Sequence, residues 1–521
     1  APRLAPAMRA VRRPDALPAA VPSAAGTTLT AVSTPRGTGG YRRLGAGPGW
    51  RRVVREDLAG AGRSRAGRRT PLTAFVHFTD LHVVDVQHPL RYEYLRAASD
   101  SVWRPQEALS VAGAVALIER VNALRGGPVT GAPLGFVMTT GDNTDNNCTA
   151  ELEWFLTAMS GGRVSPNTGD PRGYEGVQDS GLKLFWQPGA DLRDAYKQAG
   201  YPRLEGYLDA AIREVHSPGL ALPWYGTVGN HDVLPGGAYA GGDPWLAEFA
   251  VGGRKLFELP ASVGAGIWER LRKGLDPRAE LVQEILRAHT RDMRSVTPDE
   301  RRAPFTRKEY VAAHLDPRWT GPGPAGHGYT AANVAEDRLY YTFRVSDDVV
   351  GVSLDTTRRG GHYTGAVGAA QLRWLERRLA EHRDEHVLVF SHHTSRTTPD
   401  GGAELTGLLR RNPQVVAWIN GHSHRNEITP HGTFWEVSTA SHIDFPQLAR
   451  TIELTDNGDG TLSLFTTLVE SAAPYSADHD DLSQTGLAAL YRELAHNAPG
   501  RRRTLAGEPG DRNTELLLPK R

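Results

Sequence analysis

The sequence predicts a layered α/β protein, because short β-rich runs alternate with amphipathic helical patterns. Five apolar runs each end abruptly in polar residues, most of which can bind metal ions. Runs this short and β-rich are typical of buried strands rather than of amphipathic helices. With the polar residues that end them, they occupy residues 72–82, 134–143, 222–232, 386–393 and 415–424. A chain of 521 residues can bury a large core around such strands without disulfides or structural zinc.

Helical patterns lie between these runs. Residues 105–125 begin with a proline and then repeat apolar residues at intervals of three and four. Residues 369–383 place leucines on one face and arginines on the other, and a shorter helix is expected at 403–411. Further strands are expected at 338–345, 349–356, 433–440 and 451–470. The last of these is interpreted as a hairpin that turns at residues 457–460; the same residues resemble a calcium loop but lack its downstream Glu.

Composition divides the chain into three parts. Residues 1–64 are interpreted as a basic arm rich in Pro, Ala, Gly and Arg, and this arm is expected to be partly disordered. Residues 65–475 form the main domain, in which the loop-rich segments 151–221 and 233–335 are interpreted as insertions. Residues 476–521 are expected to hold one helix and a tail. An apolar cluster in the arm could instead pack against the main domain: Tyr41, Leu44, Trp50, Val53 and Val54.

Charge and composition exclude several classes of protein. No run of 18 or more apolar residues occurs, so we expect no transmembrane segment. Cys148 is the only cysteine in the sequence, which rules out an intramolecular disulfide and a cysteine-based zinc module. The first 70 residues carry 14 Arg, but only Tyr41 and Trp50 lie among them as aromatic residues. Since single-stranded nucleic acid is bound by basic and aromatic residues together, we expect no nucleic-acid partner.

The polar residues at the ends of the five runs are candidate metal ligands. Two of the motifs place metal-binding side chains two residues apart at a strand end, so that both leave on the same face. In open α/β sheets, ligands gather at the carboxyl ends of the strands. The candidates are Asp80, His82, Asp142, Asn230, His392, His422 and His424. Two carboxylates, one amide oxygen and four imidazoles suit Mn²⁺, Fe or Zn²⁺ rather than a soft metal.

Together these motifs resemble those of the calcineurin-like metallophosphoesterases. In family order, across residues 72–470, they are D-x-H at 80–82, G-D-x-x-D at 141–145, G-N-H-D at 229–232, the strand-terminal His392, and G-H-x-H at 421–424. The chain is similar to a long, actinobacterial-type branch of that family whose members are often exported. Because of this resemblance, and because the sequence begins with Ala rather than Met, we expect a secreted or extracytoplasmic protein.

The resemblance implies a four-layer α/β/β/α sandwich with long loop and helical insertions and a two-metal centre at its mouth. Carried over by position, one metal would be bound by Asp80, His82 and His424, the other by Asn230, His392 and His422, and Asp142 would bridge both. The metals would be two divalent or mixed-valence ions of Mn, Fe or Zn. A Tyr–Fe(III) centre is disfavoured, because the purple acid phosphatases have a Tyr where this sequence has Asp145.

The resemblance also implies a metal-dependent phosphoric ester hydrolase. A hydroxide between the two metals would attack phosphorus, and His231, oriented by Asp232, would protonate the departing oxygen. We expect a small phosphoester substrate, and the two insertions favour a phosphodiester because they could wall the site. A phosphomonoesterase or nucleotidase using the same metals is the alternative, and a non-catalytic secreted binding protein is a second one.

Four other residues near the motifs are assigned roles by position. Asp145 is interpreted as a brace for its loop or for a ligand rather than as a ligand itself. His393 follows a candidate ligand and could touch substrate or make a supporting hydrogen bond. His442 and Asp444 lie just beyond a predicted strand after the last motif, so they could line the site.

Overall fold

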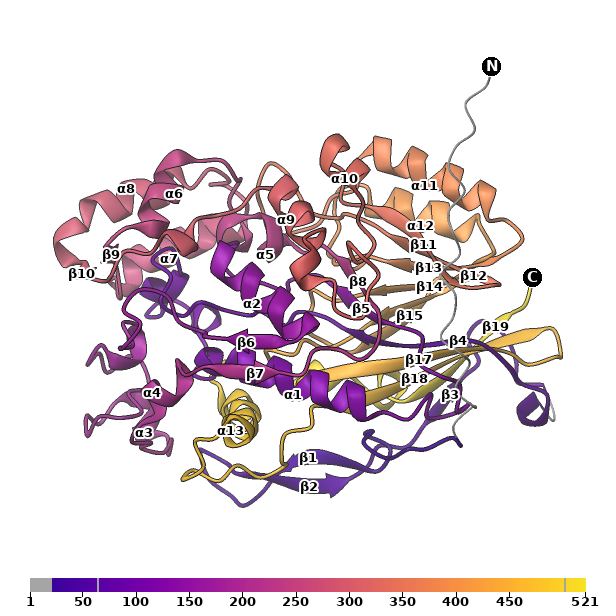
Figure 1. The fold of residues 1–521 in the computed structure, drawn as a ribbon, viewed down its shortest axis with the longest axis horizontal. Helices are drawn as coiled ribbons and strands as arrows, with labels where there is room; N and C mark the ends of the chain where they lie inside the picture. Colours follow the sequence, from indigo (N-terminus) through magenta and orange to yellow (C-terminus); the bar gives the residue numbers. More distant parts are fainter. Residues whose placement is uncertain (1–20, 63–64, 501–502) are drawn as a thin grey trace.

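Two mixed β-sheets lie face to face in the computed structural model, which describes residues 21–62, 65–500 and 503–521 (Figure 1). The seven-stranded sheet has the order β3 (Val53–Arg55), β19 (Thr514–Pro519), β18 (Thr461–Glu470), β17 (Leu448–Asp456), β4 (Thr70–Phe78), β5 (Val137–Thr140), β8 (Trp224–Thr227). The six-stranded sheet has the order β11 (Tyr341–Ser346), β12 (Val349–Ser353), β13 (His386–Phe390), β14 (Val415–Asn420), β16 (Trp435–Ser438), β15 (Glu427–Pro430). Strands β4, β5 and β8 run parallel, as do β12, β13, β14 and β16.

The main core lies between the two sheets. Phe75 of β4 stacks on Phe136 at a ring-centroid distance of 4.7 Å, and it also meets Phe390 of β13 edge-on at 5.9 Å. These three rings are buried, and they belong to one continuous cluster that includes apolar residues of both sheets. Each fully buried side chain of this size contributes about 1.5–3 kcal/mol to folding. The runs that the sequence predicts as buried strands therefore supply the contact between the sheets.

Helices cover the outer faces of the two sheets. On the six-stranded sheet, α11 (Ala369–Glu381) and α12 (Gly402–Arg410) pack through buried leucines against β13 and β14. On the seven-stranded sheet, α1 (Ser110–Ala123) and α2 (Thr149–Ser160) are buried along most of their length. The result is the predicted four-layer α/β/β/α sandwich, and the fold class is confirmed. The predicted helices and strands agree with these elements to within a few residues, and β17 and β18 form the predicted hairpin.

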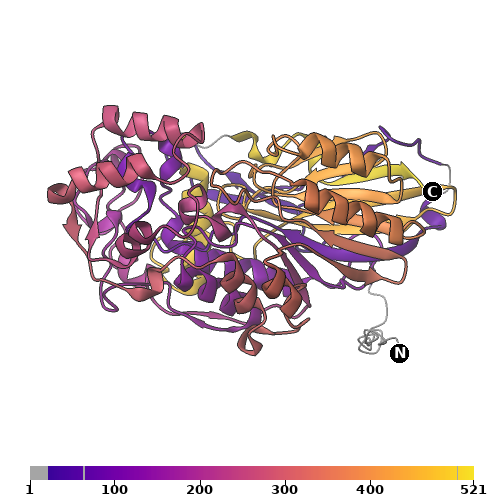
Figure 2. The same ribbon diagram turned by 90° about the horizontal axis from the view of Figure 1, so that it is seen from above.

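Much of the two insertions forms a lobe beside the sandwich (Figures 1 and 2). The first contains β6 (Gly162–Val164), α3 (Ala195–Gln198), α4 (Tyr207–Ala211) and β7 (Val215–Ser217). The second begins after the short α5 (Asn230–Val233) and contains α6 (Pro244–Val251), β9 (Arg254–Lys255), α7 (Ala261–Arg272), α8 (Glu280–Ala288), β10 (Arg294–Ser295), α9 (Arg307–His314) and α10 (Ala331–Glu336). Of these elements, β6, β7, α9 and α10 lie close to the sheets. Much of this lobe shares a second apolar cluster, which includes Trp186, Tyr207 and Leu286. The insertions are thus folded units rather than open loops.

The N-terminal segment is folded where it is described, as the alternative of a docked apolar cluster allowed. Residues 1–20 lie outside the described part, but residues 21–62 contain the hairpin β1 (Ala31–Pro35) and β2 (Leu44–Pro48), followed by β3. Leu44 is buried, Tyr41 and Trp50 pack against apolar clusters, and β3 pairs with β19. The arginines of this segment are compatible with docking: Arg43 pairs with the buried Glu493 of the C-terminal segment at 3.1 Å, and Arg55 donates to the Ile428 carbonyl at 2.7 Å.

The C-terminal segment also differs from the predicted helix and tail. The helix is present as α13 (Gln484–Asn497), but residues 514–519 form β19, which lies between β3 and β18 in the seven-stranded sheet. Its sequence, TELLLP, is short and follows a Gly-rich stretch, so no periodicity marks it as a strand. Within the described ranges, none of the helices combines the length and the apolar character needed to cross a membrane.

Candidate metal centre

The candidate ligands converge because they follow the carboxyl ends of five strands. Asp80 and His82 follow β4, Asp142 follows β5, and Asn230 follows β8 in one sheet. From the other sheet come the residues after β13 and β14, namely His392, His422 and His424. Backbone hydrogen bonds tie adjacent loops together: the Asp80 and His82 amides donate to the carbonyls of Gly141 and Asp142, each at 3.0 Å. The structure thus brings all seven predicted residues to one end of the sandwich.

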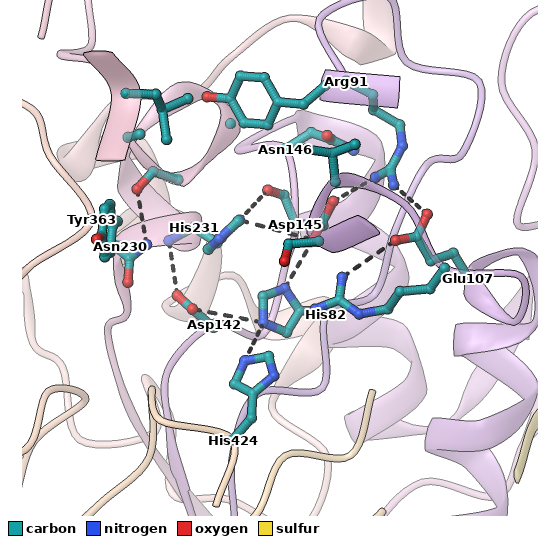
Figure 3. A pocket seen from close by; sticks show the side chains of 18 of the residues that line it. His82, Arg91, Glu107, Asp142, Asp145, Asn146, Asn230, His231, Tyr363 and His424 are labelled. Carbon is teal, nitrogen blue, oxygen red and sulfur yellow. Dashed lines mark hydrogen bonds and ion pairs between the residues drawn. The ribbon is translucent and has the colours of Figure 1, made fainter. Parts of the chain in front are cut away.

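Asp80, His82 and His424 form one group of ligand atoms, all of which lie within 4.8 Å of one another. The Nε2 atoms of His82 and His424 are 3.3 Å apart. Asp80 Oδ1 lies 3.3 Å from His424 Nε2 and 3.9 Å from His82 Nε2. The imidazole nitrogens and the carboxylate oxygen therefore point at a common centre, and Figure 3 shows His82 and His424 pointing at one another.

Asp142 lies between this group and a second one. Its Oδ2 is 3.1 Å from His392 Nε2 and 3.7 Å from His82 Nε2. Its Oδ1 accepts a hydrogen bond of 2.8 Å from the backbone N–H of His231, which fixes the carboxylate in place. On the far side of Asp142, His422 Nδ1 lies 3.2 Å from His392 Nε2. A carboxylate with one oxygen facing ligands of both groups has the placement that a bridge between two cations requires.

The donor atoms of this site fit a pair of cations. Two buried oxygens that face the site, Asp80 Oδ1 and Asn230 Oδ1, have no hydrogen-bond partner. The Asn230 amide is oriented by its Nδ2, which donates to the Gly237 carbonyl at 2.8 Å and so turns Oδ1 inward. Buried polar atoms are rarely left unsatisfied, and one cation beside each oxygen would satisfy them.

The backbone is strained at the same residues. Five of the seven candidate ligands adopt a positive φ: Asp80 at 52°, His82 at 43°, Asp142 at 50°, His422 at 61° and His424 at 55°. A non-glycine residue in this left-handed region costs about 1–3 kcal/mol and persists where the surrounding structure imposes it. Such strain concentrates at functional sites. Here the strained residues lie after β4, β5 and β14, where the chain turns sharply and presents its side chains to the shared centre.

The glycines that precede three ligands are required by close backbone packing. A Cβ on Gly141 would lie 2.4 Å from the Gly229 nitrogen, and one on Gly229 would lie 2.2 Å from Asp142 Oδ1. A Cβ on Gly421 would meet Asp80 Oδ2 at 2.4 Å. These are distances that carbon atoms do not reach, so a side chain here would push the loops apart. The G-D, G-N-H-D and G-H-x-H motifs thus carry a packing requirement as well as ligands.

Burial and charge act in opposite directions on the titratable groups of the site. Burial opposes the ionisation of Asp80, but His424 and His392 outweigh it and lower the pKa of Asp80 to about 2. Burial also opposes protonation of His392, yet Asp142 and Asp80 raise its pKa to about 9. The pKa of His424 is likewise raised to about 9 against burial, through Asp80 and Asp444. The carboxylates therefore attract positive charge strongly to this position.

His231 lines the cavity, but Asp232 does not orient it as predicted. The His231 ring lines the cavity, and its Nδ1 lies 2.6 Å from the Asp145 carbonyl oxygen. The Asp232 carboxylate is buried and accepts from the backbone N–H groups of Gly229, Asn143 and Thr144 at 2.8–3.0 Å. Asp232 therefore braces the loops after β5 and β8. Burial, followed by repulsion from Asp142, raises its pKa to about 7.

Two carboxylates orient histidines of the first group. Asp145 Oδ1 lies 2.9 Å from His82 Nδ1, in agreement with the brace expected for Asp145. Asp444 Oδ2 lies 2.7 Å from His424 Nδ1. Metal-binding histidines commonly hydrogen-bond a carboxylate or a carbonyl through the second ring nitrogen, which fixes the tautomer and the ring orientation. Asp444 thus orients the candidate ligand His424 and does not itself line the cavity.

The other two histidines near the motifs differ: His393 lies beside the second group, its ligand atom within 4.8 Å of those of His392 and His422, whereas His442 lies apart. His393 is engaged at both nitrogens, with Nδ1 2.8 Å from Thr356 Oγ1 and Nε2 2.9 Å from the Tyr363 carbonyl. It therefore supports the loop that carries Tyr363, although its ring is also close to His422 at a centroid distance of 4.3 Å. His442 is buried against Tyr491 and does not line the cavity. Burial lowers the pKa of His442 to about 3.

A cavity of about 330 Å³ opens above the candidate ligands. One wall consists of residues from the sandwich, and the other consists of residues from the lobe. The residues of the second insertion that line it are Gly236, Gly237, Ala238, Trp268, Leu271 and Arg272. Tyr92, Val102 and Tyr363 add further apolar surface. None of the described lining residues belongs to the first insertion, so only the segment 233–335 walls the site as predicted.

Comparisons with known proteins give only distant similarities. Neither the models of known families nor the curated proteins give a match. Among solved structures, a dimetal phosphatase from Danio rerio aligns at 11% identity and a TM-score of 0.38, over 77% of this chain and 100% of its own. A putative 5'-nucleotidase from Staphylococcus aureus aligns at 13% identity and a TM-score of 0.31, over 79% of this chain and 57% of its own.

The sulfate thiohydrolase SoxB from Thermus thermophilus aligns at 12% identity and a TM-score of 0.30, over 82% of this chain and 61% of its own. This chain thus spans less than two thirds of the length of two of these three proteins. TM-scores this low do not transfer an activity. The function proposed below rests instead on the geometry of the site.

Proposed function

We propose that this protein is a dinuclear metal-dependent phosphoesterase. The observation that carries the proposal is that six donor residues from four strand ends form groups of close ligand atoms, with Asp142 between two groups and Asn230 lining the same cavity. One cation would be held by Asp80, His82 and His424, and the other by Asn230, His392 and His422. Imidazole nitrogens mixed with hard oxygens suit Mn, Fe or Zn, as two divalent ions or a mixed-valence pair.

When bound, two such cations would polarise phosphoryl oxygens and lower the pKa of a water molecule. The chain itself supplies the positioning and the proton. His231 is about a quarter exposed at the cavity wall, and its Nδ1 is engaged by the Asp145 carbonyl. This contact leaves Nε2 as the nitrogen that can give a proton to the departing oxygen. Asp145 thereby replaces Asp232 as the residue that orients the proposed acid.

We favour a phosphodiester as substrate. Support comes from the walls of the cavity, because the second insertion adds apolar surface beside the ligands, chiefly Trp268 and Leu271 of α7. A second ester substituent would have apolar surface to contact there, whereas a simple monoester would leave much of this wall unused. A phosphomonoesterase or nucleotidase using the same metals is the competing activity, and the ligand set serves both.

A substrate panel tests this proposal. The purified protein is analysed for bound metal and then assayed on matched monoesters and diesters, including cyclic nucleotides, glycerophosphodiesters and aryl phosphate esters. We expect two metal ions per chain and a higher kcat/KM on diesters. A higher kcat/KM on monoesters would replace the diester preference, and two bound ions without hydrolysis of any ester would leave only a binding function.

A further inference from the structure

Two arginines that line the cavity are already neutralised by carboxylates. Arg91 contacts three of them: Nε is 3.2 Å from Glu93, while Nη1 and Nη2 bond Asp145 and Glu107. Its side chain is only 4% exposed. A guanidinium that clamps a phosphate presents free N–H groups in a bidentate fork. The N–H groups of Arg91 instead contact carboxylates in the protein interior.

Arg104 is engaged in the same way. Its Nε and Nη2 lie 2.8 and 3.3 Å from the two oxygens of Asp444, which makes a bidentate pair. Its Nη1 lies 3.3 Å from Glu107 Oε1. All three nitrogens of this guanidinium therefore face carboxylates, as in Arg91. In a phosphoesterase, arginines beside the metals would ordinarily be assigned to substrate binding, but the contacts of these two favour another role.

Glu107 joins the two arginines into one chain of contacts. Its Oε2 bonds Arg91 and its Oε1 bonds Arg104, and the side chain is only 3% exposed. Beyond the arginines, the chain ends on the carboxylates that orient two candidate ligands. In order, it runs His82, Asp145, Arg91, Glu107, Arg104, Asp444 and His424. Figure 3 shows its first half, from His82 to Glu107. The Nε2 atoms of the two terminal histidines face each other at 3.3 Å, so the chain closes around the first group of ligands.

The second group of ligands is supported differently. His392 Nδ1 lies 2.8 Å from the Thr140 carbonyl, which belongs to the buried strand β5. Asn230 is held by the Gly237 carbonyl at 2.8 Å. Both supports are backbone carbonyls, whose positions are set by the fold rather than by side-chain charges. A change in the buried ion pairs should therefore act on one half of the site and spare the other.

We propose that Glu107, Arg91 and Arg104 are positioning residues for one metal site only, the one formed by Asp80, His82 and His424. The inference rests on the proposed function, since it assumes that these residues bind metal. The two arginines contact four carboxylates that would otherwise repel one another in the interior: Glu93, Glu107, Asp145 and Asp444. Glu107 in turn fixes the distance between the arginines, and so between Asp145 and Asp444. Asp145 contacts the imidazole of His82, and Asp444 contacts that of His424. Both rings are thereby held in the tautomer that presents Nε2 to the cation.

Replacing the central carboxylate tests this role. Glu107→Gln keeps the side-chain size but removes the charge that both arginines share. We expect the parent protein to retain two Mn²⁺ ions per chain after desalting and the variant to retain one, with the second Mn²⁺ bound about 10–100-fold more weakly in a titration. Metal content and Mn²⁺ affinity are measured directly, so the result does not depend on turnover.

Glu453→Gln is the matched control. Glu453 is equally buried, lies in β17, and accepts hydrogen bonds from the backbone N–H groups of Val129 and Thr130. Within the described structure, Glu453 contacts none of the seven side chains in the series of contacts that begins at His82 and ends at His424. Its substitution should lower the melting temperature but leave both Mn²⁺ ions bound at parental affinity. If the removal of any buried charge caused a loss of metal, this control would lose metal as well.

Three outcomes would overturn the inference. First, Glu107→Gln could bind both ions at parental affinity and show a raised KM for substrate. The arginines would then be substrate-binding residues. Equal weakening of both ions would show that the chain supports the whole site. If Glu107→Gln does not fold, Asp444→Asn is used, because it disturbs only the contact at His424. Parental binding of both ions by Asp444→Asn would also overturn the inference.

The same measurements separate this inference from the proposed function. A parent that binds fewer than two ions contradicts both. A parent that binds two ions but hydrolyses no phosphoester contradicts only the function, and the selective loss of one ion in Glu107→Gln would still stand.

Discussion

The sandwich and the lobe contribute different kinds of residue to the same cavity. Every candidate ligand leaves a strand end of the sandwich, where the two sheets are packed on buried aromatic rings such as Phe75 and Phe390. The lobe contributes glycines, Trp268, Leu271 and Arg272, and no candidate ligand. Strand ends of a packed core hold donor atoms at fixed distances, whereas a helix laid over the opening can vary in sequence without disturbing them.

The sandwich and the lobe should therefore respond differently to substitution. Changes at the sandwich end should alter metal binding and turnover. Changes in the lobe should alter substrate affinity while metals stay bound. The predictions below test this separation.

Asp142→Ala should have the largest effect. Removal of the carboxylate between the two ligand groups should release both metals and remove several kcal/mol of transition-state stabilisation, which is at least about a thousandfold in kcat. The fold should survive on its large core. Metal analysis, circular dichroism and the rate on an aryl phosphate ester measure the three quantities.

The control for this variant is Asp209→Ala, which removes an exposed carboxylate from α4 in the lobe. It should keep two metals and the parental rate. If Asp142→Ala kept both metals as well, the bridging position assigned to Asp142 would be wrong.

His231→Ala should separate proton transfer from metal binding. Because the ring is held by the Asp145 carbonyl and has no ligand role in the proposal, the variant should retain two metals. Loss of the general acid should slow substrates with alkoxide leaving groups about a hundredfold or more and leave nitrophenolate esters nearly unaffected.

Gly237→Ala probes the same ring from the lobe side. A Cβ at residue 237 would lie 2.4 Å from His231 Nε2. We expect it to reproduce the leaving-group dependence in a weaker form. An equal slowing of both ester types in His231→Ala would contradict the assigned role.

The sequence predicted the ligands because they share a local signal. Each is a metal-binding residue type placed directly after a short β-rich run, and the glycines beside them mark tight turns. The structure brings Asp80, Asp142 and His392 together as that signal implies. Asp232 has the same kind of signal, since it follows Gly229 in the G-N-H-D motif, yet its carboxylate turns to the backbone instead. A motif specifies which residues are near a site but not which way each one points.

The supporting residues could not be found from the sequence in the same way. Arg91, Glu107 and Arg104 follow no strand and form no motif, and Arg104 meets a partner 340 positions away at Asp444. They lie in the irregular segment between β4 and α1, and only the folded structure brings them to Asp145 and Asp444. The N-terminal hairpin could not be predicted for a related reason: its Gly- and Arg-rich sequence has little apolar periodicity, and it is held by distant residues, Glu493 of α13 and Glu470 of β18.

Trp268→Ala tests the lobe directly. Trp268 lines the cavity from α7, so its loss should raise KM for an aryl diester about two- to tenfold, the value of roughly one aromatic contact. Metal content and kcat should stay near parental values. Trp245→Ala is the matched control, since Trp245 stacks on Phe249 in the same lobe but does not line the cavity. A parental KM in Trp268→Ala, or an equal rise in both variants, would remove α7 from substrate binding.

The smallest effect on activity is expected from the N-terminal hairpin, where the change should appear in stability and in its pH dependence. The buried Glu493 carboxylate of α13 accepts from Tyr41 Oη at 2.9 Å, from Arg43 Nε at 3.1 Å and from His479 Nε2 at 2.8 Å. Burial opposes its ionisation, but hydrogen bonds from His479 and Tyr41 and the charge of Arg43 outweigh it, so the pKa of Glu493 lies below its ordinary value. A carboxylate whose pKa is lower in the folded state stabilises the fold fully above its unfolded-state pKa, near about 4.3. That contribution is lost as the pH falls from there through the folded-state pKa.

Glu493→Gln should therefore destabilise the protein at pH 7 by about 1.5–3 kcal/mol, the value of hydrogen bonds to one charged group. The difference from the parent should shrink as the pH falls below about 4.3, where the parental carboxylate becomes protonated as well. Urea unfolding at a series of pH values measures the difference, and kcat on a small ester should be unchanged at pH 7. Asp480→Asn, at an exposed position before α13, is the control and should show no such pH dependence. A constant difference in the free energy of unfolding between parent and Glu493→Gln at all pH values would contradict this expectation. The hairpin would then be held by packing rather than by the charge of Glu493.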